Sequence, residues 1–210
     1  MPEPTVRVRM KESALRRHRC ALRIRCRVAC ALILATTLDE DSMNQTANNP
    51  QQISAVLPSS VPRVAVISSC WHEEIVEKGT AAIRAELVRS GIPSGQVREF
   101  KVPGAFEIPL HVQKLARSGQ YDAIIACALV VNGGIYRHEF VAGAVIDGLM
   151  RVQLDTGTPV FSVVLTPRDF HEHDEHRSFF SEHFVKKGTE GARACIQTVA
   201  SLGQPAFEKS

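Results

Sequence analysis

The stretch "YDAIIACALVV", residues 121–131, decides the fold that this sequence predicts. After its first two residues it is apolar at every position and shows no alternation of apolar and polar side chains. A strand with this pattern is covered on both faces, as in a parallel sheet that lies between two layers of helices. The stretch therefore predicts a buried parallel strand with helices on either side of its sheet.

Outward from this strand, strand patterns and helix patterns alternate along the chain. Short β-branched runs such as "RVAVISS" (63–69) predict strands, and the stretches between them carry a single apolar stripe, which is typical of helices. Strand–helix alternation with such short loops favours one parallel α/β sheet that is covered on both sides. The predicted strands are 63–69, 96–102, 121–131 and 159–167, and the predicted helices are 72–90, 105–118, 136–156 and 185–202.

Composition narrows the class of protein. The chain has 210 residues, 44% of them hydrophobic and 22% charged, which suits one soluble domain with a sizeable core. Its net charge of +3 comes from residues 1–42, because the remainder holds sixteen basic and seventeen acidic residues. Nothing in the body therefore suggests a nucleic-acid surface. The six cysteines form no CxxC motif, and we expect reduced thiols in a cytoplasmic protein.

The first 60 residues are predicted to be a basic and polar, disordered extension that precedes a domain at 61–210. The first 42 residues have three interpretations: a signal peptide, a disordered or targeting arm, or translation from a start assigned too far upstream. The last is favoured, because Met43 opens the ordinary polar leader "MNQTANNPQQ". The apolar run "VACALILATTL" is too short to span a bilayer, so no membrane segment is expected.

The carboxyl ends of the predicted strands are where a parallel α/β sheet gathers its ligands. "CWHE" places Trp71 directly after the first strand, either as a core aromatic or as a flat surface on which a planar ring stacks. "VPGAFEIP" (102–109) places Glu107 in the first turn of a helix. There its carboxylate can interact favourably with the positive end of the helix dipole, or it can bind a ligand. "VNGGIYRH" (131–138) brings backbone N–H groups toward a possible anion.

The segment 168–183 is rich in histidine and follows the fourth strand. His171, His173 and His176 have a spacing that could ligate a metal, whereas the interleaved acidic residues fit a solvated loop. A phosphate or substrate contact from one of these histidines is favoured over a metal site. The sequence contains neither GxGxxG nor GxxxxGK[ST], so it has no dinucleotide fingerprint and no P-loop.

Taken together, these motifs resemble the lumazine synthase family from about Val61 to Leu202. "VPGAFEIP" is a highly specific match, and "YDAII", the following glycine turn, "GTPV" and the last "KG…A" helix agree in order and spacing. Trp71, the "GGIYRH" turn and the histidine-rich segment resemble the divergent type II branch of that family.

The resemblance implies a flavodoxin-like, three-layer α/β/α sandwich with a four-stranded parallel sheet. It also implies assembly as pentamers, with a decamer of two stacked pentamers expected for the type II branch. The implied reaction is the penultimate step of riboflavin biosynthesis, without metal or cofactor. It condenses the small molecules 5-amino-6-(D-ribitylamino)uracil and 3,4-dihydroxy-2-butanone 4-phosphate to 6,7-dimethyl-8-ribityllumazine.

Site residues follow from the resemblance, position by position. The substrate-binding positions are Trp71, which stacks on the pyrimidine, Ala105, Phe106 and Glu107 along the ribityl chain, Leu129, Val130 and Val131 beside the pyrimidine, and Ser162, where relatives often have Phe. The phosphate-binding positions are Gly134, Ile135 and His176.

Two departures from the family pattern concern the chemistry. Arg137, not His138, falls at the position of the family's catalytic histidine, and His176 falls at that of a phosphate-gripping arginine. Arginine cannot serve as a general base, because its pKa is above about 12. Arg137 could instead hold the phosphate and stabilise negative charge, and proton transfers would pass to water, to the substrate phosphate or to a nearby histidine. If Arg137 faces the cleft, His138 is expected to point mostly away, since successive helical residues project about 100° apart.

These departures keep two other functions open. One is a pentameric shell that binds a lumazine or flavin with little turnover. The other, weaker because it leaves "VPGAFEIP" unexplained, is a flavodoxin-type electron carrier.

Overall fold

The four strands form one parallel sheet. The computed structural model of the chain describes residues 61–135, 137–171 and 173–203, so the predicted extension at 1–60, with Met43, lies outside the described residues. Strands β1 (Val64–Ser69), β2 (Val97–Val102), β3 (Ala123–Leu129) and β4 (Val160–Leu165) lie in the order β2-β1-β3-β4. Every residue of β1 and β3 is buried, as their uninterrupted apolar runs predict.

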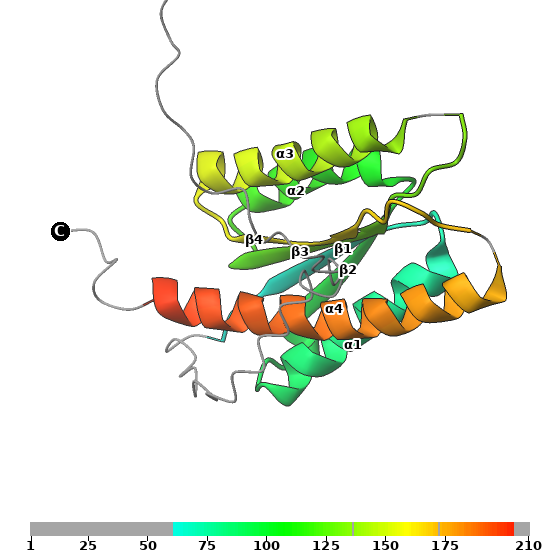
Figure 1. Cartoon of the computed structure of the whole chain (residues 1–210). Coiled ribbons are helices and arrows are strands. Elements are labelled where there is room, and N and C mark those ends of the chain that lie inside the picture. The colour runs from blue at the N-terminus through cyan, green and yellow to red at the C-terminus, as the bar shows by residue number, and fades with distance from the viewer. Residues whose placement is uncertain (1–60, 136, 172, 204–210) are drawn as a thin grey trace, which may run out of the picture. The chain divides into compact units, whose positions relative to one another are not determined.

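Four helices cover the sheet, two on each face (Figure 1). Helices α1 (Glu73–Arg89) and α4 (Asp174–Leu202) lie on one face, and α2 (Ile108–Arg117) and α3 (His138–Thr156) lie on the other. Alternate residues of each strand point into one of two hydrophobic cores, because side chains alternate across a strand. The prediction of a three-layer α/β/α, flavodoxin-like fold is confirmed. Short 3-10 helices, η2 (Ser94–Gln96) and η3 (Ala105–Glu107), precede β2 and α2.

Glycines let α1 and α4 approach each other closely. A Cβ atom added to Gly188 would lie 2.5 Å from the backbone oxygen of Gly79, and one added to Gly79 would lie 2.6 Å from the ring of Phe184. Each of these distances is well below van der Waals contact, so a larger residue would push the two helices apart. These helical glycines weaken local helix propensity but allow the close packing of this layer.

Helix α4 begins earlier than predicted, at Asp174 rather than at residue 185. The histidine-rich segment is therefore largely the first three turns of a 29-residue helix and not a loop. Asp174 and Glu175 lie in its first turn, where their negative charges stabilise the helix by interacting with the positive end of its dipole. The sequence prediction failed because this part is polar on most sides, and its few apolar contacts, such as Phe180 with the α1/α4 core, depend on tertiary packing.

Fewer residues of strand β4 are buried than predicted. It lies at an edge of the sheet, and only Val163 and Val164 of its six residues are buried. The sequence shows the apolar run but does not show that the strand has a neighbour on one side only. Among the residues that the structure describes, none of the helices combines the length and the apolar character that a membrane crossing needs.

Candidate active site

The four turns that follow the strands lie at the carboxyl edge of the sheet. The turn after β1 contains Trp71, whose side chain is 65% exposed, so its interpretation as a core aromatic was wrong. The turn after β2 contains Gly104 and Glu107. A Cβ atom on Gly104 would lie 4.0 Å from Cε2 of the Trp71 indole and 2.9 Å from Oε2 of Glu107. The structure thus brings the indole, the glycine and the carboxylate together.

Glycine at position 104 leaves space for the Glu107 carboxylate rather than supplying backbone freedom. Its φ of −145° is ordinary extended backbone, which any residue adopts, but a side chain would displace the Glu107 carboxylate. Pro103 and Pro109 stiffen the two ends of this turn. Ala105 is buried beneath it, whereas Phe106 is 65% exposed. The turn therefore presents one aromatic ring and one half-buried carboxylate on a rigid backbone.

His72 connects the turn after β1 to the histidine-rich segment. It has a φ of 53°, the left-handed conformation that non-glycine residues rarely adopt, and its ring packs edge-on against Phe170, 5.1 Å away between centroids. The backbone N–H of the neighbouring His171 donates to Nδ1 of His176 at 3.3 Å. Because Nδ1 of His176 accepts this bond, its Nε2 is left to donate to an anion. The phosphate contact expected of His176 stays a prediction.

The histidine cluster gives no support to a metal site. The rings of His171 and His173 lie 6.2 Å apart, and those of His171 and His176 lie 5.3 Å apart. Within the described parts of the chain, no group of three or more His, Cys, Asp or Glu side chains is placed to hold a metal ion.

The turn before α3 carries the other predicted phosphate residues. Gly134 has a φ of 75°, which requires glycine, and its N–H donates to Oδ1 of Asn132 at 3.2 Å. Ile135 is 85% exposed. Arg137 is exposed in the position that caps α3, and its guanidinium carbon lies 4.6 Å from the centre of the Phe140 ring. The turn thus presents a fixed backbone and a permanent positive charge to solvent.

His138 has surroundings different from those of Arg137. Its side chain is only 11% exposed, and its Nδ1 lies 3.5 Å from Oε2 of Glu139 without forming a hydrogen bond. His138 is therefore largely buried, whereas Arg137 is exposed. Arg137 is the extended residue that precedes α3, so the helical spacing of about 100° on which the prediction rested does not apply between these two residues.

The remaining predicted residues occupy two kinds of position. Leu129 and Val130, at the end of β3, are buried, and Val131 is half-buried. Ser162 is exposed but lies in the middle of β4, three residues before the strand ends, and its Oγ accepts the Val164 N–H at 3.4 Å. Ser162 is thus the predicted site residue that lies away from the strand ends.

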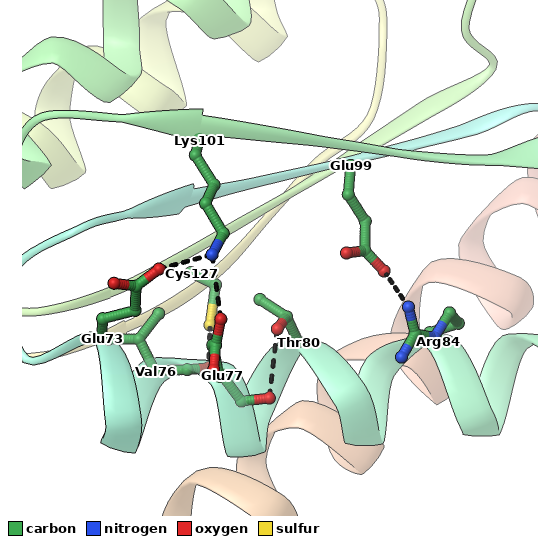
Figure 2. Close-up of polar contacts among 8 residues, drawn as sticks. All are labelled: Glu73, Val76, Glu77, Thr80, Arg84, Glu99, Lys101 and Cys127. Atoms are coloured by element: carbon green, nitrogen blue, oxygen red, sulfur yellow. Dashed lines mark hydrogen bonds and ion pairs between the residues drawn. The ribbon is translucent and has the colours of Figure 1, made fainter.

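A hollow of about 760 Å³ lies on the face of the sheet that α1 and α4 cover, between these two helices and the edge strand β2. Figure 2 shows the charges along it: Lys101 Nζ donates to Glu73 at 2.5 Å and to Glu77 at 2.9 Å, and Arg84 pairs with Glu99 at 2.9 Å. Hydrogen bonding to Lys101 holds the pKa of Glu77 below its ordinary value. These charges compensate one another, so we place the candidate site at the turns and not in this hollow.

Sequence reasoning missed two contacts at these turns, because each joins residues that lie in separate patterns. The packing of His72 on Phe170 is not visible in either segment alone. The contact of Arg137 with Phe140 has a local signal, since residues three apart on a helix are neighbours, and it could have been predicted.

Comparison with known proteins identifies relatives over the described domain. The model of the family described as 6,7-dimethyl-8-ribityllumazine synthase matches residues 62–202. A protein of that name from Rhodococcus erythropolis is 61% identical over 140 residues, which cover 67% of this chain and 90% of the relative. Two proteins named 6,7-dimethyl-8-ribityllumazine synthase 2 are each 52% identical to this chain. The match to the protein from Pseudomonas syringae pv. tomato covers 65% of this chain and 81% of the relative. The match to the protein from Bradyrhizobium diazoefficiens covers 67% of this chain and 84% of the relative.

Proposed function

The chain belongs to the 6,7-dimethyl-8-ribityllumazine synthase family, and from this premise we propose that its carboxyl-edge site is the active site of such an enzyme. It condenses 5-amino-6-(D-ribitylamino)uracil with 3,4-dihydroxy-2-butanone 4-phosphate to 6,7-dimethyl-8-ribityllumazine, the penultimate step of riboflavin biosynthesis. This reaction releases inorganic phosphate and water. The enzyme is favoured over a shell that only binds a lumazine or flavin, because the relatives carry the name of the synthase.

One observation carries the assignment of the site. The exposed indole of Trp71 and the carboxylate of Glu107 converge on Gly104, in the turn with the specific sequence "VPGAFEIP". A flat aromatic surface suits a pyrimidine ring, and a carboxylate accepts hydrogen bonds from a polyol chain. With the rigid backbone of Ala105 and Phe106, and with the edge formed by Leu129, Val130 and Val131, these groups would hold the ribitylaminouracil. Ser162 contributes to this site only if a ligand extends down the edge strand.

The phosphate substrate needs groups of the opposite charge. The Gly134 N–H is donated to Asn132, so the turn at Gly134 and Ile135 would meet the phosphate through the Ile135 N–H and the positive end of the α3 dipole. Arg137 adds a charge that persists at any working pH. His176 supplies an Nε2–H donor from the first turn of α4. We propose that these residues bind the phosphate and stabilise the negative charge of the leaving phosphate.

Arg137 cannot carry protons, so its part in the reaction is electrostatic and positional. Formation of a C=N bond from an amine and a ketone requires proton transfers, which pass to water, to the substrate phosphate or to a nearby histidine. General acid–base assistance typically accelerates a reaction by about 10²–10⁴-fold. A condensation that is driven mainly by the positioning of two substrates can therefore proceed without it, but more slowly.

Self-association is part of the proposal. Ile146, Met150 and Leu154 form a stripe along α3 with exposed fractions of 38%, 53% and 74%, although they are apolar. Such a stripe supports contact with a second copy of the chain, and we propose a pentamer and, for this branch, a decamer. Light scattering coupled to size-exclusion chromatography measures the mass, and a monomer at assay concentration would contradict this part.

We also propose that the protein acts in the cytoplasm. Cys70, Cys127 and Cys195 are free thiols, and burial raises the pKa of the last two to about 12. Buried protonated thiols suit a reducing compartment.

The direct test is an assay of the purified protein with both substrates. We expect formation of 6,7-dimethyl-8-ribityllumazine, measured by its absorbance and fluorescence, above the uncatalysed rate in a protein-free control. A protein that binds the product and yet shows no rate above that control would contradict the proposed function.

A further inference from the structure

Two buried polar atoms lie at the carboxyl end of the sheet without a hydrogen-bond partner. They are Oγ of Ser69 and Nδ1 of His138, and within the described parts of the chain no other buried side-chain nitrogen or oxygen atom lacks one. Ser69 is 3% exposed, and the side chain of His138 is 11% exposed. A buried polar atom that forms no hydrogen bond loses its contacts with water and gains nothing in return, so such atoms are rare and call for an explanation.

Both residues face the same layer of the protein. Ser69 is the last residue of β1 and follows Ala65 and Ile67 at two-residue spacing, so it points to the core beneath α2 and α3. His138 is the first residue of α3 and lies two helical turns before Val145, which belongs to the same core. Helix α3 also packs on the 3-10 turn η3. In the sheet, Ser69 lies beside Val102, which directly precedes the turn to which the ribityl chain is assigned, and His138 begins the helix that packs on this turn.

The packing itself does not require polar atoms at these two positions. Alanine at position 69 and phenylalanine at position 138 would occupy similar space and would leave no unpaired atom. The nearby Glu139 carboxylate does not pair with the imidazole, because the 3.5 Å contact lacks hydrogen-bond geometry and Glu139 is itself 61% exposed. A fold that carries such a cost at its binding edge indicates a function for these atoms.

We propose that Ser69 Oγ and His138 Nδ1 are two further hydrogen-bonding positions of the substrate site and that hydroxyl groups of the ribityl chain satisfy them. The proposal rests on the proposed function and adds two specificity-determining residues to it. A hydroxyl can donate and accept, so it can pair with the serine hydroxyl and with either tautomer of a neutral imidazole. In this arrangement Arg137 serves the phosphate substrate, and its neighbour His138 serves the polyol.

The test measures equilibrium affinity for two probes by the quenching of Trp71 emission. One probe is 6,7-dimethyl-8-ribityllumazine, and the other is 6,7,8-trimethyllumazine, which has the same rings but no polyol chain. The variants are Ser69→Ala, His138→Phe and His138→Asn, in the full-length protein. Ser68→Ala is the matched control, because Ser68 is also buried on β1 but faces the opposite layer, along the hollow near α1.

Ser69→Ala and His138→Phe are each expected to weaken binding of the ribityl probe about 3- to 10-fold, the effect of one lost hydrogen bond. Binding of the trimethyl probe and of both probes to Ser68→Ala should not change. The melting temperature of the unliganded variants should stay the same or rise, because an unpaired polar atom is removed. His138→Asn should retain more affinity than His138→Phe, since the amide places a polar atom near the position of Nδ1.

Equal affinity of parent, Ser69→Ala and His138→Phe for the ribityl probe would overturn this inference while the proposed function stands. An equal loss for both probes would also overturn it, because general distortion would then explain the result. If His138→Phe fails to fold, Ser69→Ala and His138→Asn still decide. A parent that neither binds the ribityl probe nor forms it from the two substrates would instead contradict the proposed function itself.

Discussion

The guanidinium carbon of Arg137 lies 4.6 Å from the centre of the Phe140 ring, one helical turn away. A cation over an aromatic face is attracted to it, so Phe140 holds the arginine side chain at the start of α3. Phe140 is 66% exposed, a position that burial alone does not explain for so large an apolar residue. The contact thus fixes the charge that we assign to the phosphate.

Replacement of Arg137 by alanine is expected to lower kcat/KM for the butanone phosphate about 10- to 100-fold, because a charge-assisted hydrogen bond is lost. Phe140→Leu should have a smaller effect in the same direction, since the charge remains but its support is removed. Steady-state kinetics with the butanone phosphate varied would measure both. Arg151→Ala is the control, because Arg151 is 81% exposed farther along the same helix. Comparable losses in Arg137→Ala and Arg151→Ala would contradict the assignment.

Trp71 is the only tryptophan in the chain, so its emission reports on its own surroundings. If the pyrimidine stacks on the indole, ribitylaminouracil should quench this emission at saturation. Trp71→Ala should weaken binding by about 1–3 kcal/mol, the usual contribution of base–aromatic stacking, and Trp71→Phe should weaken it less. Calorimetry measures the variants, which lack the fluorophore. Unchanged emission at saturating ligand would rule out stacking.

His176→Arg tests the phosphate contact from α4. An imidazole offers a phosphate one or two N–H donors, whereas a guanidinium offers a fork of five donors and a permanent charge. KM for the butanone phosphate should therefore be lower in the variant than in the parent. His183→Arg, farther along α4, is the control. The same KM in parent and His176→Arg would place His176 outside the site.

Glu86 lies away from the site, and its charge is expected to contribute to the stability of the fold. It is 6% exposed and accepts hydrogen bonds from Arg89 on its own helix and from Arg193 on α4. The bond with Arg89, more than that with Arg193, holds the pKa of Glu86 below its ordinary value of 4.5. Its charged form therefore stabilises the fold above about pH 4.5, and this contribution is lost as the pH falls through the lower, folded-state pKa.

At pH 7, Glu86→Gln should lower the free energy of unfolding by about 1–2 kcal/mol. The difference from the parent should shrink as the pH falls below 4.5, the ordinary value. Urea denaturation at several pH values measures it. Glu190→Gln, which breaks the exposed pair with Lys187, is expected to change little at any pH. A constant difference for Glu86→Gln across the pH range would show that packing, not charge, is responsible.

Residues 1–42 are predicted to be dispensable, because the family match covers only 62–202. A protein that begins at Met43 should fold, assemble and retain the specific activity of the full chain. Circular dichroism, light scattering and the lumazine assay would measure this. Aggregation or lost assembly of the shorter protein, with the full chain intact, would give the extension a structural role.

The amino-acid sequence by itself determined the layers of this protein. Apolar runs without alternation, such as 123–129, can be stable only when both faces are covered, and short loops leave few ways to connect them. The predicted strands and the first three helices agree with the observed bounds to within three residues at each end, and the largest difference is at the start of α2. The motif "VPGAFEIP" likewise indicated the family, because its eight residues are consecutive in the sequence and can be recognised without the tertiary structure.

Only the tertiary structure decided what each turn contacts. Whether Trp71 was a core aromatic or an exposed surface depended on the neighbouring strand, since Gly104 lies 33 residues away in the sequence. The early start of α4 and the thin cover of β4 depended in the same way on what packs beside them. Which of Arg137 and His138 turns inward depended on how α3 is rotated on the sheet, and that rotation is set by contacts such as Gly148 against Pro109. Sequence patterns report the period of an element, whereas its depth and rotation come from residues that are distant in the chain.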